Sequence, residues 1–138
     1  MDRHARHRRS LPDPRRRPSP GWRAPSLEAF ARLVDRGVDM LPADIRDRLD
    51  NIEITIEDVP PADYADEVLL GLYEGVPVTE RTWGAAMLPD RIRLFRGPLE
   101  ARAVSADDLA REVAVTVLHE IAHHFGIDDD RLDDLGWG

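Results

Sequence analysis

The sequence has no cysteine and no lysine among its 138 residues. Without cysteine, disulfide bridges, thiolate zinc sites and catalysis by a cysteine nucleophile are all excluded. No apolar run approaches the roughly 18 residues of a membrane-spanning helix. We therefore expect a chain that does not span a bilayer, and its composition is compatible with the cytoplasmic location that we predict.

The formal net charge of -8 is unevenly distributed along the chain. Residues 1–23 carry eight arginines and two aspartates (+6), whereas residues 24–138 carry eleven arginines and 25 acidic residues (-14). Because neutralisation of phosphates supplies most of the affinity for nucleic acids, the acidic body is a poor general nucleic-acid binder.

The first 25 residues combine arginine clusters with five of the eleven prolines. This composition predicts a disordered arm over residues 1–25, followed by a single domain over residues 26–138. The arm could contact RNA or another anionic surface. We favour a solvated tail, because the arm lacks the interleaved aromatic residues of a base-stacking platform.

The middle of the chain alternates between helical and strand patterns. Apolar residues at three- and four-residue steps after Ser26 predict a capped helix, and a second short helical piece follows over residues 43–50. The alternating residues 52–57 predict a strand with one buried face. Residues 68–73 predict a short strand that is broken by glycines, and residues 91–96 predict an edge or near-edge strand that ends at Gly97.

The last long pattern predicts a helix of about six turns. Ser105 and Asp108 form a capping box, and Gly126 supplies a left-handed cap at the other end. A four-residue spacing of apolar residues predicts a strongly buried side, made of Leu109, Val113, Val117, Ile121 and Phe125.

A metal-binding pattern lies at the end of this helix, in the segment HEIAHHFGIDDD. His119 and His123 are one helical turn apart, so that their side chains point in nearly the same direction and can take two corners of a zinc tetrahedron. Glu120 lies about 100° around the helix. It therefore misses the metal but can reach a metal-bound water as a general base. His124 points away from His123, so we expect it to pack in the core or support a ligand, and we expect Phe125 in the core.

A catalytic zinc requires a third protein ligand and a fourth position for water. In the metzincin pattern a third histidine follows the second by six positions, and here that position holds Asp129. Asp128 and Asp130 are alternatives if the turn after Gly126 differs. Asp133 or Asp134 could accept a hydrogen bond from a ligand imidazole. The rival interpretation is that these histidines and aspartates are ordinary solvated surface residues.

The run LLGLYEGVPVTER, LPDRIRLFRGPL and VLHEIAHHFGIDDDRLDDLGW resembles the small bacterial family of minimal zincin-like proteins. The resemblance implies an α+β fold with a small mixed sheet packed on the active-site helix. It also implies one Zn²⁺ held by His119, His123 and Asp129, with Glu120 as the catalytic base. In larger zincins the strand that corresponds to RIRLFR pairs with extended substrate, which would give Arg91–Arg96 a binding role.

The sequence thus predicts a zinc metallopeptidase that hydrolyses peptide bonds, acting on small peptides or with narrow specificity. Zinc would polarise the scissile carbonyl, and Glu120 would take a proton from the attacking water. Tyr73 is a candidate for further oxyanion stabilisation. The alternative is a zinc-stabilised binding module without catalytic activity, which would present RIRLFR to a partner.

Overall fold

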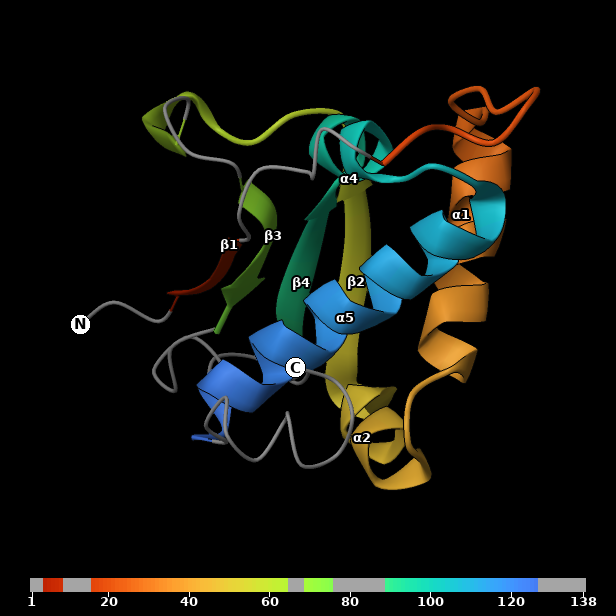
Figure 1. Cartoon of the computed structure of the whole chain (residues 1–138). Coiled ribbons are helices and arrows are strands. Elements are labelled where there is room, and N and C mark those ends of the chain that lie inside the picture. The colour runs from red at the N-terminus through yellow and green to blue at the C-terminus, as the bar shows by residue number, and fades with distance from the viewer. Residues whose placement is uncertain (1–3, 9–15, 65–68, 76–88, 127–138) are drawn as a thin grey trace.

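The computed structural model describes residues 4–8, 16–64, 69–75 and 89–126 (Figure 1). Within these ranges, strand β1 (His4–Arg8) precedes helix α1 (Leu27–Asp39) and helix α2 (Ala43–Arg48). They are followed by strands β2 (Ile52–Glu57), β3 (Leu69–Glu74) and β4 (Asp90–Phe95), and then by helices α4 (Arg96–Arg102) and α5 (Ala106–His124). Short 3-10 turns occupy Leu49–Asn51 and Ala62–Tyr64. This is the α+β class expected from the sequence.

The four described strands form one mixed sheet in the order β1-β3-β4-β2. β1 and β4 are both antiparallel to β3, whereas β2 is parallel to β4. One face of the sheet carries Tyr73, Ile92 and Leu94, which are fully buried beneath α5. Figure 1 shows α5 crossing this face, so the sheet packs on the helix that carries the histidine motif.

Local sequence signals position α5 as predicted. The Ser105 hydroxyl accepts a hydrogen bond from the Asp108 amide at 3.0 Å, and Gly126 after the helix has φ +76°. The helix is more deeply buried than a single apolar stripe requires, because the sheet, α1 and α4 all contact it. Its end, which bears the motif, is therefore held from several sides.

Helix α1 packs against α5 through a close backbone approach. The Ser26 hydroxyl caps α1 as predicted, accepting from the Ala29 amide at 3.2 Å. A Cβ atom added at Gly37 would lie 2.6 Å from the carbonyl oxygen of Ala110, so only glycine allows this spacing. The buried face of α1 consists of Phe30, Leu33, Val34 and Gly37, whereas Leu27 from the predicted stripe is 53% exposed.

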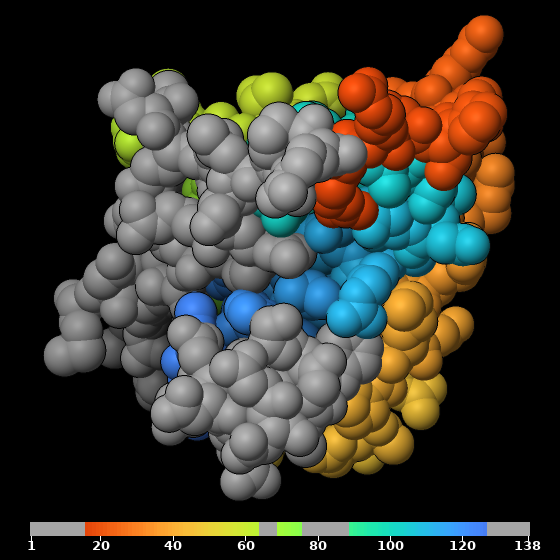
Figure 2. All heavy atoms as spheres, in the orientation of Figure 1, coloured from red at the N-terminus to blue at the C-terminus, as the bar shows by residue number. Residues whose placement is uncertain are grey.

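Two described parts of the N-terminal arm have backbone contacts with the rest of the chain. Strand β1 pairs with β3, and the amide of Ser19 donates to the carbonyl of Val104 at 2.8 Å. The Arg16 guanidinium also donates to Asp108 at 2.7 Å, and Figure 2 shows the segment from residue 16 on the surface beside the start of α5. Composition alone could not reveal these partners, because the acidic helix start and the sheet edge come from distant parts of the chain. The domain boundary at residue 26 stays a prediction.

Strand β4 lies next to the edge strand of the sheet. The alternation of arginines predicted an edge or near-edge strand, and β4, which lies between β3 and the edge strand β2 and is hydrogen-bonded on both sides, is a near-edge strand. A short helix begins immediately afterwards at Arg96, and Pro98 is tolerated there because it falls in the first helical turn.

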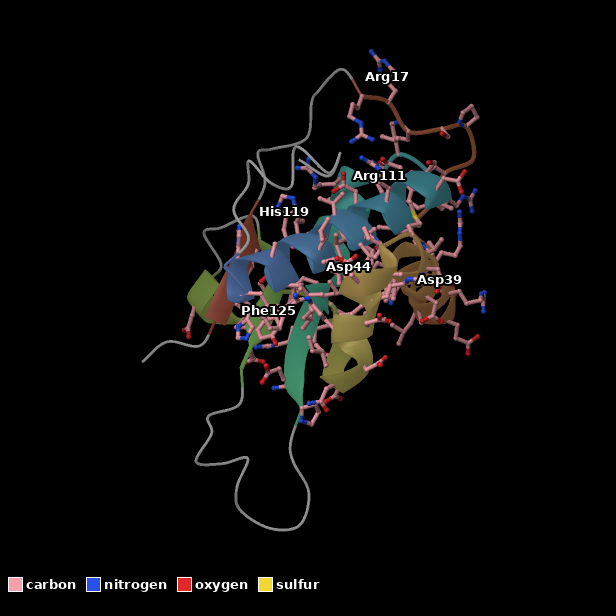
Figure 3. The ribbon with its side chains drawn as sticks, turned by 90° about the horizontal axis from the view of Figure 1, so that it is seen from below. Arg17, Asp39, Asp44, Arg111, His119 and Phe125 are labelled. Atoms are coloured by element: carbon pink, nitrogen blue, oxygen red, sulfur yellow. The ribbon has the colours of Figure 1, made fainter. Side chains whose placement is uncertain are left out.

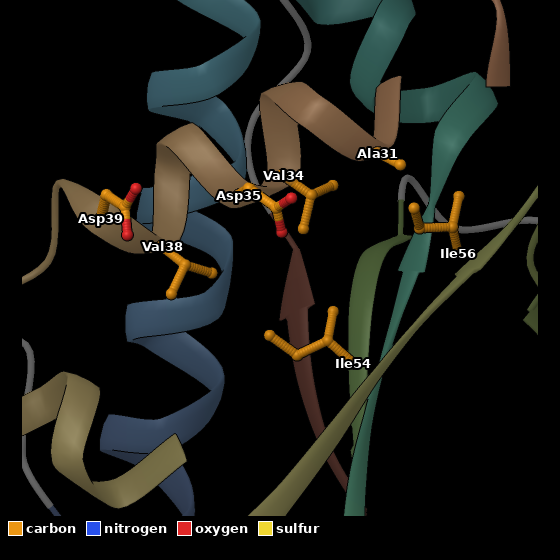
Figure 4. A pocket seen from close by; sticks show the side chains of 7 residues that line it. All are labelled: Ala31, Val34, Asp35, Val38, Asp39, Ile54 and Ile56. Atoms are coloured by element: carbon orange, nitrogen blue, oxygen red, sulfur yellow. The ribbon is translucent and has the colours of Figure 1, made fainter. Parts of the chain in front are cut away.

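A groove of about 570 Å³ lies between α1 and β2 (Figure 4). Its walls are apolar except for Asp35 and Asp39, and all of its lining residues come from these two elements. The groove is therefore separate from the histidine motif. Among the described residues, no helix has both the length and the hydrophobicity needed to cross a membrane.

Candidate metal centre

The end of α5 brings two imidazoles together. The ring centroids of His119 and His123 are 6.1 Å apart, with an interplanar angle of 60°. His119 is half-buried and His123 is exposed, so that both rings lie at the boundary between the helix and solvent. Figure 3 shows His119 projecting from the helix on a different side from Phe125. This is the neighbouring arrangement that the four-residue spacing predicts.

Glu120 lies between these histidines in sequence but points into the protein. Its residue is 0% exposed, and Oε2 accepts a hydrogen bond from the backbone amide of Tyr73 at 3.1 Å. The other oxygen, Oε1, is buried without a hydrogen-bond partner in the described structure. Desolvation raises the pKa of Glu120 to about 9, although the bond from the Tyr73 amide opposes the shift. A buried acidic group with an oxygen that lacks a partner among the described residues costs folding free energy, and such groups occur preferentially at functional sites.

Tyr73 is the centre of the contacts behind the motif. Its hydroxyl donates to Oδ2 of Asp90 at 2.6 Å, and its ring stacks on His124 with centroids 4.0 Å apart and an interplanar angle of 17°. Nε2 of His124 is 3.9 Å from the same Asp90 oxygen. His124 therefore stacks behind the motif but is exposed and does not lie in the core, and its role in supporting a ligand stays a prediction. Asp90 was not predicted from the sequence, because nothing local links the first residue of β4 to the end of α5.

The donor set fits a zinc ion. Two imidazoles from one helical turn are typical zinc ligands, and a carboxyl group on the same turn has the position in the sequence of a general base. Within the described ranges, no group of three or more histidine, aspartate or glutamate side chains could hold a metal. The expected third ligand Asp129, its alternatives Asp128 and Asp130, and the supporting Asp133 and Asp134 lie outside the described residues.

The family model of zincin-like metallopeptidases matches residues 49–137, which include β2, β3, β4, α5 and the whole histidine motif. The chain belongs to the zincin-like metallopeptidase family. The match covers more than half of the chain and leaves the N-terminal arm and α1 outside.

A conserved hypothetical protein from Thermo thermophilus has a solved structure similar to this zincin-like chain. The two are 28% identical, and the similarity covers 73% of this chain and 94% of the other, with a TM-score of 0.49. No curated protein matches the zincin-like chain significantly.

The arginines of β4 in this zincin-like protein do not have the substrate-binding arrangement that the resemblance implied. Arg93 donates to Glu57 at 2.7 Å, and Arg91 donates to Glu74 at 3.1 Å. Arg96 donates to Glu100 at 2.7 Å and to a backbone carbonyl. Because β4 is also an interior strand, it cannot add an extended peptide to the sheet.

Phe125 corrects a smaller expectation. It was predicted in the core, but it is 45% exposed and lies under the guanidinium of Arg48, which is 4.7 Å from the ring centroid. The four-residue apolar spacing places Phe125 on the buried stripe. The helix ends at His124, however, so the stripe does not continue to this residue.

Proposed function

We propose that this zincin-like chain is a zinc-dependent peptidase in which His119, His123 and Asp129 hold one zinc ion and Glu120 is the general base. The observation that carries the proposal is the buried carboxyl of Glu120, with one oxygen fixed and the other without a partner among the described residues, on the helical turn that bears the two imidazoles. When bound, zinc would supply Lewis-acid polarisation of the scissile carbonyl and acidify a water molecule.

The contacts of Glu120 support a division of labour between its two oxygens. Oε2 is held by the Tyr73 amide, which fixes the carboxylate relative to β3. Beside a bound cation the carboxyl of Glu120 would ionise, and Oε1 would then accept a proton from the attacking water and deliver it to the leaving amine. The Tyr73 hydroxyl donates to Asp90. We therefore assign Tyr73 to positioning Glu120 through its amide, in place of oxyanion stabilisation.

Asp129 remains the third ligand that we propose. Gly126 has a left-handed backbone, which is the conformation that ends a helix and lets the chain turn back. The sixth position after His123 then holds a carboxylate, which zinc accepts at about 2.0–2.2 Å. We propose peptides as the substrates and the cytoplasm as the location of the protein. The absence of cysteine is compatible with that location.

The competing proposal is a zinc-stabilised binding module without turnover. The environment of Glu120 favours the enzyme, because a module that uses zinc only for folding gains nothing from a desolvated carboxyl group with an oxygen that has no partner among the described residues. The strand RIRLFR, by which such a module would bind a partner, is β4, and β4 lies between two other strands of the sheet.

The test combines metal analysis with turnover of a peptide library. The purified chain should hold one zinc ion, His119→Ala and Asp129→Ala should lose it, and the neighbouring His124→Ala should keep it. Glu120→Gln should keep the metal while turnover falls by about 10²–10⁴-fold, the usual contribution of a general base. Zinc without turnover in the unmodified chain would favour the module, and retention of zinc by Asp129→Ala would exclude this third ligand.

A further inference from the structure

Strand β1 occupies the edge of the sheet nearest to the histidine motif. His4–Arg8 pairs antiparallel with β3, and the same strand contacts α5. Figure 1 shows β1 beside β3, at the opposite end of the sheet from β2 and α1. The N-terminal segment therefore lies where the outer strand meets the helix that carries the motif.

The register aligns this segment with the proposed catalytic base. Ala5 is the Cα partner of Tyr73, whose amide holds Glu120 and whose ring stacks on His124. Cα atoms of paired residues in antiparallel strands are about 4.5–5.5 Å apart. A chain in the position of β1 thus runs directly past the residue that positions the carboxylate.

An outer strand is the natural binding site for an extended peptide. Its unpaired N–H and C=O groups accept another strand, and main-chain hydrogen bonds then provide affinity without requiring a particular sequence. In this structure that position on β3 is filled by a segment of the same chain.

Charge favours a basic occupant of this position. Residues 1–23 carry a balance of +6 and the remainder of the chain carries -14. Asp90 lies against the part of β3 that β1 covers, where it accepts from the Tyr73 hydroxyl, and Glu74 on the same part of β3 is paired with Arg91 and Arg93. The basic composition of the segment HARHR is therefore complementary to the net charge of the rest of the chain.

We propose that β1 is an intramolecular occupant of the peptide-binding edge of β3, so that the chain masks its own site, and that the ligands of this edge are extended, arginine-containing peptides. The proposal deepens the proposed function and rests on it. Because a peptide added in trans can bind only the fraction of molecules in which β1 has left β3, its apparent affinity is reduced by that fraction. A chain masked about 90% of the time would bind such a peptide about tenfold more weakly than an open one.

A reversible disulfide lock tests this inference in the full chain. His4 and Glu74 are register partners, and their strand spacing suits a disulfide. Since the chain has no cysteine, His4→Cys with Glu74→Cys introduces the only thiols. The matched control pairs His4→Cys with Asp35→Cys on α1, at the opposite end of the sheet.

Binding of a fluorescein-labelled peptide with the sequence of residues 1–10 is measured by anisotropy, in a Glu120→Gln background so that the probe is not cut.

We expect oxidation to form an intramolecular disulfide in the Glu74 variant but not in the Asp35 control. The oxidised Glu74 variant should bind the probe at least about tenfold more weakly than its reduced form, with recovery after reduction. Failure to form the disulfide, or unchanged probe affinity in the locked chain, would overturn the inference. If the lock changes affinity but the reduced chain with Glu120 restored cleaves no peptide, the proposed catalysis fails while the assignment of the β3 edge stands.

A second variant opens the site without a disulfide. In antiparallel pairing, the backbone N–H groups of successive residues point alternately toward the partner strand and away from it. The double substitution Ala5→Pro with Arg6→Pro must therefore remove at least one N–H group that points toward β3. Probe affinity should rise by at least about tenfold, and Ser10→Pro with Leu11→Pro, outside β1, should leave it unchanged. Equal affinity of the two double-proline chains would contradict the masking.

Discussion

The backbone amide of Tyr73 donates to Oε2 of Glu120 at 3.1 Å, which joins β3 to α5 between residues 47 positions apart. The bond comes from the main chain, so it survives most substitutions at residue 73. The Tyr73 side chain has a separate partner, because its hydroxyl donates to Asp90 at 2.6 Å. The placement of the carboxylate and the stability of its surroundings can therefore be tested separately.

Tyr73→Phe should destabilise the fold without removing zinc. The change deletes a buried hydroxyl that donates to a carboxylate and keeps the amide that holds Glu120. We expect the free energy of unfolding to fall by about 1–3 kcal/mol, measured by urea denaturation, with the zinc content unchanged. In a double-mutant cycle with Asp90→Ala, the two effects should be coupled by about 0.5–3 kcal/mol. Additive effects would show that the hydrogen bond contributes nothing to stability.

The features of α5 that the sequence predicted correctly are all local. Ser105 and Asp108 are three residues apart, Gly126 comes two residues after the end of the helix, and His119 and His123 share one turn. Caps and helical spacing depend only on neighbouring residues, so the sequence contains the information for them. The placement of the two histidines on one helical turn could be predicted for this reason.

The contacts of β4 could not be predicted in the same way. Arginines on alternate positions are typical of an exposed edge, yet Arg93 lies between Glu57 on one neighbouring strand and Glu74 on the other. The acidic partners compensate the charge across the strands, which permits an interior position. Which strands become neighbours depends on residues far apart in the chain, as does the pairing of β1 with β3.

Gly71 illustrates how the packing of distant elements changes the interpretation of a residue. The sequence suggested that this glycine breaks a strand, but β3 continues through it to Glu74. A Cβ atom at residue 71 would lie 2.7 Å from Cγ2 of Thr116 on α5. The glycine therefore permits a close approach of strand and helix, and its presence does not mark a turn.

Gly71→Ala should destabilise the fold by about 1–3 kcal/mol, the usual cost of overpacking a core. It should also weaken the Tyr73–Glu120 bond, because β3 must move away from α5. Thr116→Ser removes the clashing methyl group and keeps the hydroxyl that donates to the carbonyl of Glu112. The double variant should therefore recover part of the stability lost by Gly71→Ala in thermal denaturation. If Thr116→Ser adds its own loss without recovery, the clash with Thr116 is not the cause.

Acid should weaken the contact between β2 and β4. Arg93 donates to both carboxylate oxygens of Glu57, and the hydrogen bond from Arg93 lowers the pKa of that carboxyl below its ordinary value of 4.5. Since the folded-state pKa is the lower one, the stabilisation is fully present above the unfolded-state pKa and is lost as the pH falls through the folded-state value.

Glu57→Gln should lower the melting temperature at pH 7 and have a smaller effect at pH 3. The exposed Glu53→Gln on the same strand serves as the control and should leave the difference between the two pH values unchanged. A Glu57→Gln chain whose melting temperature falls between pH 7 and pH 3 as much as that of the unmodified protein would show that this ion pair contributes nothing to acid sensitivity.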